Sequence, residues 1–341
     1  MVIRQRLYDK VNEEVRSFAR RYGLDDVNVD ESDALASLES AVKVLRDSDP
    51  DAELFILVDE YDRFSNELMV LPDSSLYDGV VGTSDKASGP LRAFLTATKS
   101  LSNILPTRSF VTGLTPISLA DASSANIYKT VSFEKSVAGT FGFTEADVKD
   151  GLSRLTHLED HQRQTAFDFM TTYFNGYLYY PTEDETSKVY NPQLTLNFLQ
   201  MLCTAEGPQI LRDWQEGNAT VANLVMRVDD PKTRVSKSAL ELLAKSSLTF
   251  ADITLLAAKG SIKTSFSLVQ QPFTLAQLMR PVTDTYAETQ QRDRMLAFMF
   301  AHGIVTFDQS RVDKYDTDVV YLEVPNEVVR HQLLRSIQSR L

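Results

Sequence analysis

The sequence has almost no cysteine, because Cys203 is the only one among 341 residues. A single thiol cannot close an internal disulfide, so a disulfide-stapled scaffold and a cysteine-rich metal site are both excluded. Cys203 follows the apolar run 198–202, which predicts a buried and unreactive thiol. These features favour a reducing compartment, and we expect a cytoplasmic or nuclear protein.

Long hydrophobic runs are missing as well. No stretch reaches the roughly 20 apolar residues that cross a bilayer, and no apolar signal segment follows the charged N-terminus. We therefore expect no membrane partner. The hydrophobic share of 43% and the charged share of 24% indicate a folded chain, and its length exceeds what one compact core usually spans.

Basic side chains are in deficit, with 35 Lys and Arg against 47 Asp and Glu, for a net charge of −12. This balance repels nucleic acid from the chain as a whole. The deficit lies in residues 1–230, whereas 231–341 carry a slight basic excess. We expect an α/β core at 1–135, a helical lid region at 136–230 and a winged-helix-like region at 231–341.

The order of the patterns predicts an α/β fold for the first region. Helical spacing of apolar residues at 6–22 and 32–45 is followed by 54–58, a continuous apolar run typical of a strand buried on both faces of a parallel sheet. A helical pattern begins at Gly89-Pro90, and 109–112 is strand-like. A strand, a crossover helix and a second strand form a βαβ unit, whose strands are parallel.

Weaker patterns complete the chain. We expect a turn-rich loop at 72–88, a further strand at 130–133 and a helix from Thr144 with that residue as its N-cap. Three helical patterns followed by strand-like runs at 304–307 and 319–324 resemble a winged-helix arrangement.

The strongest candidate site is the pair Asp59 and Glu60 at the end of the first strand. Ligands of open α/β sheets bind beyond the carboxyl ends of strands, where Asp59 is placed to hold Mg²⁺ and Glu60 to polarise a water. The alternative is that both carboxylates only cap the following helix. The spacing alone favours neither interpretation.

Further polar residues lie near this pair in the predicted fold. Thr112 ends the second strand and is placed to sense a terminal phosphate, although ordinary solvation of a strand end explains it equally. Arg63, Arg92 and Arg108 flank the region and are candidates for binding phosphate, since guanidinium binds phosphate oxygens in pairs. A surface salt bridge is the alternative for each.

A phosphate-binding loop is absent. No G-x-x-x-x-G-K-[ST] occurs in the sequence, so the backbone cradle and the lysine that hold the β- and γ-phosphates are missing. The sequence therefore contains half of a nucleotide site.

Five motifs in order resemble the AAA-ATPase-like family. They are 56–62 (Ile-Leu-Val-Asp-Glu-Tyr-Asp), 109–119 (Ser-Phe-Val-Thr-Gly-Leu-Thr-Pro-Ile-Ser-Leu), 142–145 (Gly-Phe-Thr-Glu), 174–177 (Phe-Asn-Gly-Tyr) and 190–192 (Tyr-Asn-Pro). The family consists of P-loop NTPases, often fused upstream of a PD-(D/E)XK nuclease-like domain and related to the NTPase modules of Crinkler-type effectors. The resemblance covers about residues 50–205.

The resemblance implies roles for the residues at the strand ends. It makes Asp59 the Walker B acid associated with Mg²⁺, Glu60 the residue that activates water and Thr112 the sensor, with ATP and Mg²⁺ as cofactors. It also implies a P-loop strand and lysine ahead of Met1. We therefore expect an incomplete P-loop NTPase-like parallel sheet, which a missing N-terminal segment or a partner chain completes, and we expect truncation or decay of that segment.

Three functions stay open at this point. The first is a STAND-type ATP module, catalytically impaired without Walker A, in which the C-terminal region forms a lid. The second is a non-catalytic protein-interaction module. The third is a DNA-associated module that uses the mildly basic winged-helix-like end, for which a small charge excess is thin support.

Overall fold

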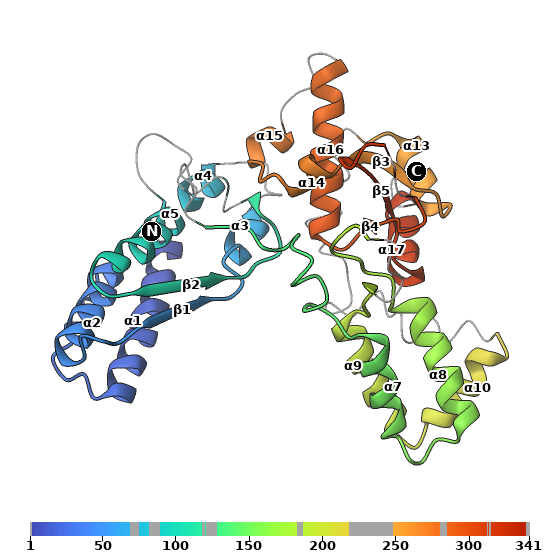
Figure 1. Cartoon of the computed structure of the whole chain (residues 1–341), viewed down its shortest axis with the longest axis horizontal. Coiled ribbons are helices and arrows are strands. Elements are labelled where there is room, and N and C mark those ends of the chain that lie inside the picture. The colour runs from blue at the N-terminus through green and yellow to red at the C-terminus, as the bar shows by residue number, and fades with distance from the viewer. Residues whose placement is uncertain are drawn as a thin grey trace. The chain divides into compact units, whose positions relative to one another are not determined.

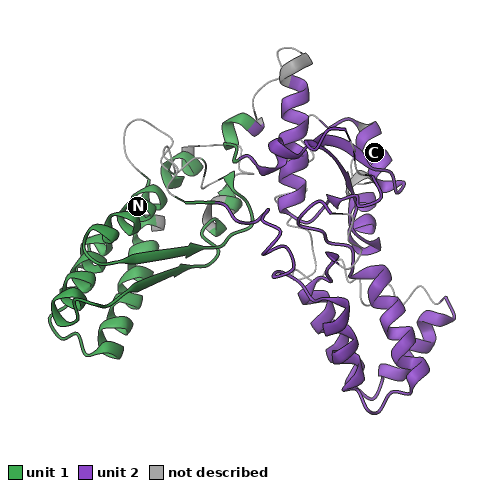
Figure 2. Cartoon of the chain, in the orientation of Figure 1, with its two compact units in different colours: residues 1–129, 272–277 green, residues 130–271, 278–341 purple. Residues whose placement is uncertain are grey.

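The computed structural model describes ten segments of the chain: residues 2–68, 75–81, 89–117, 120, 128–182, 187–217, 248–279, 285–311, 313 and 315–338. They combine helices and strands (Figure 1) and form two compact units (Figure 2). The first unit comprises residues 1–129 and 272–277, and the second comprises 130–271 and 278–341. The second unit contains residues on both sides of position 230, and the expected division at 135 and 230 stays a prediction.

The first unit is built on a βαβ arrangement. Its elements are α1 (Val2–Tyr22), α2 (Ala34–Ser48), β1 (Leu54–Val58), α3 (Arg63–Leu68), α4 (Ser75–Val81), α5 (Pro90–Ser100), the short 3₁₀ helix η1 (Leu101–Asn103) and β2 (Thr107–Val111). β1 and β2 pair in parallel, with Leu54 opposite Thr107 and Val58 opposite Val111. The predicted parallel sheet with a crossover helix is confirmed.

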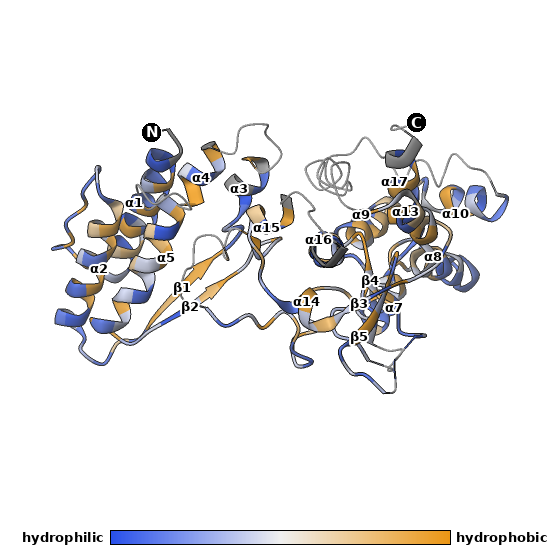
Figure 3. Cartoon of the chain, turned by 90° about the horizontal axis from the view of Figure 1, so that it is seen from above, coloured by the Kyte–Doolittle hydropathy of each residue, from blue (hydrophilic) through white to orange (hydrophobic). Residues whose placement is uncertain are grey.

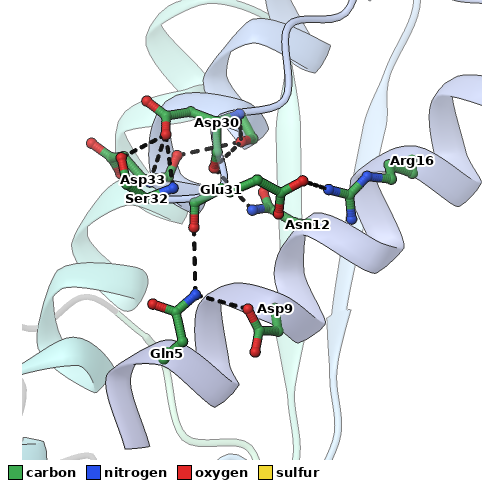
Figure 4. Close-up of polar contacts among 9 residues, drawn as sticks. Gln5, Asp9, Asn12, Arg16, Asp30, Glu31, Ser32 and Asp33 are labelled. Atoms are coloured by element: carbon green, nitrogen blue, oxygen red, sulfur yellow. Dashed lines mark hydrogen bonds and ion pairs between the residues drawn. The ribbon is translucent and has the colours of Figure 1, made fainter. Parts of the chain in front are cut away.

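The loop between α1 and α2 is bonded to α1 through side chains (Figure 4). The buried Asn12 donates from Nδ2 to the backbone oxygen of Asp30 at 2.9 Å. Asp33 caps α2 by accepting hydrogen bonds from the backbone N–H groups of its first turn. Hydrogen bonds from Ser32 lower the pKa of Asp30. These bonds fix α2 beside α1 as one helical layer.

One face of the β1–β2 sheet is covered. Leu54 and Ile56 pack against a buried cluster formed by Val42 of α2 with Leu101 and Leu105, and α1, α2 and α5 lie on one side of the two strands (Figure 3). On the opposite face Phe55, Leu57 and Phe110 are 59%, 77% and 51% exposed. The prediction that 54–58 is buried on both faces is therefore wrong for this structure, because the helices of the unit pack on a single face.

Two local predictions in and beside the first unit are also wrong. α4 forms inside the expected turn-rich loop 72–88, because Tyr77, Val80 and Val81 are buried and their packing outweighs the local turn signals. Residues 82–88 lie outside the described part of the chain. Residues 130–133 form no strand, and the backbone turns there, with the N–H of Glu134 donating to the oxygen of Val131 at 3.0 Å.

The second unit combines a helical part with a small antiparallel sheet. Its helices are α7 (Glu145–Ser153), α8 (Asp160–Tyr173), α9 (Pro192–Leu202), α10 (Gly207–Gln215), α13 (Phe250–Ala257), α14 (Phe266–Gln270), α16 (Thr285–Ala301) and α17 (Glu327–Gln338). The strands β3 (Ile262–Ser265), β4 (Thr306–Phe307) and β5 (Val319–Glu323) form an antiparallel sheet in the order β3-β5-β4. α15 (Leu275–Met279) contributes residues to both units. None of the described helices is both long and apolar enough to cross a membrane.

The helical part packs around an aromatic core. Phe169 of α8 stacks on Phe198 of α9, with ring centroids 4.7 Å apart, and meets Trp214 of α10 edge to face. Thr144 caps α7 in a capping box with Asp147, which confirms the predicted N-cap.

The prediction of a buried Cys203 is wrong, since this thiol is exposed. The buried side of α9 carries Leu194, Phe198 and Leu202. Cys203 is the next residue and lies about 100° further round the helix, because an α-helix has 3.6 residues per turn. The apolar run therefore identified the helix but not the side on which the thiol lies.

The segment around Asn175 and Gly176 joins the two parts of the second unit. It is the exit of α8, and Asn326, which precedes α17, donates from Nδ2 to the backbone oxygen of Asn175 at 3.0 Å. Gly176 has φ +106°. A Cβ built on Gly176 would lie 2.1 Å from the backbone oxygen of Pro325, a contact that no side chain can make. Glycine is required here both by backbone conformation and by space.

We expect Gly176→Ala to destabilise the second unit by about 2–4 kcal/mol, because the new methyl group meets fixed backbone at a positive φ. Fluorescence of Trp214, the single tryptophan and a member of this unit, follows the unfolding in urea. Gly139→Ala is the matched control, since a Cβ there meets no atom within 4 Å. Equal midpoints for the two variants would contradict this account of the junction.

Candidate functional site

The carboxyl ends of β1 and β2 bring Asp59 and Thr112 together. Both residues directly follow a strand, and parallel strands end at the same edge of a sheet. Thr112 Oγ1 donates to Asp59 Oδ1 at 2.5 Å. The backbone N–H of Thr112 also donates to the oxygen of Val58 at 2.8 Å, which extends the ladder by one bond. The two predicted site residues are thus in direct contact.

Asp59 keeps one carboxylate oxygen available. Its Oδ1 accepts both from Thr112 and from the backbone N–H of Glu60, at 2.9 Å. Its Oδ2 accepts no hydrogen bond from any residue that the structure describes, and the side chain is exposed. Oxygen donors of this kind, a carboxylate beside a hydroxyl, are those that Mg²⁺ prefers, with water and phosphate filling the remaining positions. The donor set therefore fits a magnesium ion that also binds a phosphate group.

Protein side chains alone do not form a metal cage. Within the described segments, no three His, Cys, Asp or Glu side chains form a group that could hold a metal ion. Mg²⁺ is commonly bound through one or two carboxylates together with substrate phosphates. A magnesium ion at Asp59 would therefore take most of its ligands from water or from a bound phosphate group.

Glu60 has a strained backbone, with φ +50°. The residues on either side of the Asp59-Glu60 pair are both bonded to Thr112, because Val58 accepts from its N–H and Tyr61 donates to its C=O at 3.1 Å. Two residues therefore face one, as in a β-bulge, a device that redirects side chains at functional sites. The left-handed conformation costs a non-glycine residue about 1–2 kcal/mol.

The bulge leaves the Glu60 carboxylate in solvent. Its Oε2 lies 3.2 Å from Arg63 Nη1 in an ion pair whose two side chains are mostly exposed. Such pairs contribute little to stability. Glu60 is therefore close to Asp59 in the chain and held only loosely.

The three predicted arginines lie at different places. Arg63 begins α3, next to the strand-end loop. Arg92 lies in the first turn of α5, and a crossover helix begins on the side where the first strand ends. Arg108 lies near the start of β2, 3.9 Å from Glu53 and over the ring of Phe55. The structure therefore pairs Arg63 with Glu60, next to the Asp59–Thr112 contact in the chain, and places Arg108 at the other end of the strand.

Asp62 and Tyr61 also shape the site, although no role was predicted for them from the sequence. The buried Asp62 accepts the backbone N–H groups of Leu114 and Thr115 at 3.1 and 2.7 Å. The Tyr61 hydroxyl donates to the backbone oxygen of Thr115. Burial raises the pKa of Tyr61, and the negative charge of Asp62 adds to the shift, so the phenol keeps its proton. Both residues belong to the motif 56–62, which was the only signal for them.

The first part of the chain is similar to a known protein family. Residues 2–123 match the family model described as "Predicted AAA-ATPase". The matched segment includes both strands and the motifs 56–62 and 109–119, while the three motifs after residue 123 lie outside it. No curated protein and no solved structure matches the chain.

The strain at Glu60 predicts an unusual order of stability. Glu60→Gly should be more stable than Glu60→Ala by about 1 kcal/mol, because only glycine adopts a positive φ without steric cost. Urea unfolding followed by far-ultraviolet circular dichroism measures the difference. Trp214 fluorescence reports the second unit and should not change between the variants. A Glu60→Ala protein at least as stable as Glu60→Gly would show that the bulge is relaxed.

Proposed function

We propose that the chain is a STAND-type nucleotide module that binds ATP with Mg²⁺ where β1 and β2 end, and the match of residues 2–123 to the predicted AAA-ATPase family model supports this. The observation that carries this proposal is the contact of Thr112 with Asp59, which leaves Asp59 Oδ2 without a donor among the described residues. If Asp59 only capped α3, its carboxylate would accept N–H groups from the first turn of that helix. It accepts instead from the Thr112 hydroxyl and from the N–H of Glu60.

Each residue has a chemical role in this proposal. Asp59 would hold Mg²⁺, and Thr112 orients the Asp59 carboxylate by its hydrogen bond. Glu60 would accept the proton of a water whose oxygen bonds to the γ-phosphorus of ATP while the bond from that phosphorus to the bridging oxygen breaks and ADP leaves, a task that suits a solvated carboxylate carried on a bulge. Arg63 and Arg92 contact phosphate oxygens. Arg108 lies at the far end of β2, so the proposal leaves it out. The metal, when bound, neutralises charge on the phosphates.

The local charge makes metal the link between protein and nucleotide. Asp59 and Glu60 repel the phosphates of ATP, and one arginine, Arg63, is paired with Glu60. Without a P-loop lysine, the attraction comes chiefly through a cation shared by Asp59 and the phosphates. Nucleotide binding should therefore depend on Mg²⁺ and be weak, with a Kd on the order of 1 mM, or about −4 kcal/mol. Hydrolysis is accordingly impaired.

We propose a winged-helix arrangement for the C-terminal part of the second unit. The sequence of elements α13, β3, α14, α15, α16, β4 and β5, with strand order β3-β5-β4, supports it. Residues 295–300 of α16 are buried, so this part of the helix has no free face that could enter a DNA groove. DNA association stays a prediction, and salt-dependent binding of DNA by the full chain would support it.

The second candidate, a non-catalytic interaction module, has one observation in its favour. Phe55, Leu57 and Phe110 are exposed on one sheet face, as expected if another segment or a partner packs on this face. Nucleotide binding and hydrolysis separate this candidate from the first.

Titration of the full chain with a fluorescent ATP analogue tests the proposal. Binding should require Mg²⁺ and disappear with EDTA, and Asp59→Asn should weaken it at least tenfold, or about 1.4 kcal/mol. Glu60→Gln should keep binding and remove any hydrolysis. Glu39→Gln, an exposed residue of α2 paired with Lys43, is the matched control. If the ATP analogue binds equally well in the presence of EDTA, or does not bind at all, the proposal is wrong and the interaction module is favoured.

A further inference from the structure

We propose that Asp62 is a positioning residue that clamps the loops following β1 and β2 together and thereby holds Asp59 against Thr112. This inference rests on the proposed function for its link to metal binding, but the clamp itself is a property of the chain. Asp62 touches no reacting group in it. It acts through the backbone of residues 114 and 115.

Asp62 makes hydrogen bonds across the two loops. Each carboxylate oxygen accepts one backbone N–H of the second loop: Oδ1 from Leu114 at 3.1 Å and Oδ2 from Thr115 at 2.7 Å. Asn66 Nδ2 also donates to Oδ2, at 2.8 Å. Asp62 and Thr115 are both almost fully buried. Hydrogen bonds to a buried carboxylate are roughly twice as strong as those between neutral groups.

The two loops also approach each other closely at Gly113. A Cβ built on Gly113 would lie 2.4 Å from Tyr61 Cε1 and 2.6 Å from Asp62 Oδ1. Tyr61 adds two further bonds, from its N–H to the oxygen of Thr112 and from its hydroxyl to the oxygen of Thr115. The side chains of Tyr61 and Asp62 thus lie against the backbone of residues 112–115, and only glycine at position 113 leaves room for them.

The clamp explains why the bulge persists. The positive φ of Glu60 is a strained conformation, and the strain would be relieved if Tyr61 moved away from Thr112. Asp62 follows Tyr61 directly, so its bonds to Leu114 and Thr115 keep Tyr61 beside Thr112. If the clamp opens, Glu60 relaxes and the Thr112 hydroxyl leaves Asp59. A strained backbone is maintained only where its surroundings hold it on both sides.

The chemistry requires a carboxylate at this position. Two N–H donors point at two oxygens, so an amide in place of the carboxylate would set its NH₂ group against a backbone N–H. Asp62→Asn has nearly the same volume and therefore tests the acceptor pair rather than the packing. Gly113→Ala tests the same contact from the other loop with Asp62 intact.

Amide hydrogen exchange on the full chain measures the clamp without any ligand. In Asp62→Asn and in Gly113→Ala, the amides of Tyr61, Leu114 and Thr115 should exchange at least tenfold faster, while the amides of α1 and α2 change less than about twofold. Glu39→Gln should resemble the wild type throughout. Uniformly faster exchange across the unit would show a general structural role, and unchanged exchange at the three amides would show no clamp. Either result overturns the proposal.

A second readout connects the clamp to the metal. At a fixed concentration of the fluorescent ATP analogue, the apparent Mg²⁺ affinity should fall at least fivefold in Asp62→Asn, or about 1 kcal/mol. An unchanged Mg²⁺ affinity together with locally faster exchange would overturn the positioning role. If the wild type shows no Mg²⁺-dependent binding but the exchange result is local, the proposed function fails while the clamp stands.

Discussion

The bonds of one buried carboxylate constrain the candidate site. Asp62 holds the loop after β2 by two backbone N–H groups, and the Asp59–Thr112 contact, the strained Glu60 and the start of α3 all lie within three residues of it or of its partners. A buried charge with fewer donors is costly, so the loops can separate only if Asp62 loses the two backbone N–H donors of Leu114 and Thr115. The site geometry is therefore a property of two loops held as one.

The sequence predicted the parts of the fold that follow from local pattern and from topology. The helices at the N-terminus, β1, β2 and their parallel pairing all came from periodicity and from the rule for βαβ units. The Thr144 cap came from side-chain chemistry. Proximity of Asp59 and Thr112 followed from the same topology, because parallel strands end at one edge.

Features that depend on distant packing were not predictable in the same way. A continuous apolar strand does not reveal whether one or both faces of its sheet are covered. In this protein Phe55 and Leu57 lie on the exposed face of the sheet. β3 carries Lys263 and Thr264 in only four residues and has no clear strand pattern until β5 is placed beside it. The roles of Tyr61 and Asp62 required the direction of two backbone N–H groups in another loop, which no residue pattern records.

The central claim is that Asp59 and Thr112 form one half of a metal–nucleotide site. Mn²⁺, a paramagnetic substitute for Mg²⁺, tests it directly by broadening the NMR signals of nearby amides. With ATP present, the account predicts loss of the Glu60 and Thr112 amide signals at substoichiometric Mn²⁺, with little change in α2. Broadening that is absent there, or that appears equally without ATP and across the acidic surface, would contradict the claim.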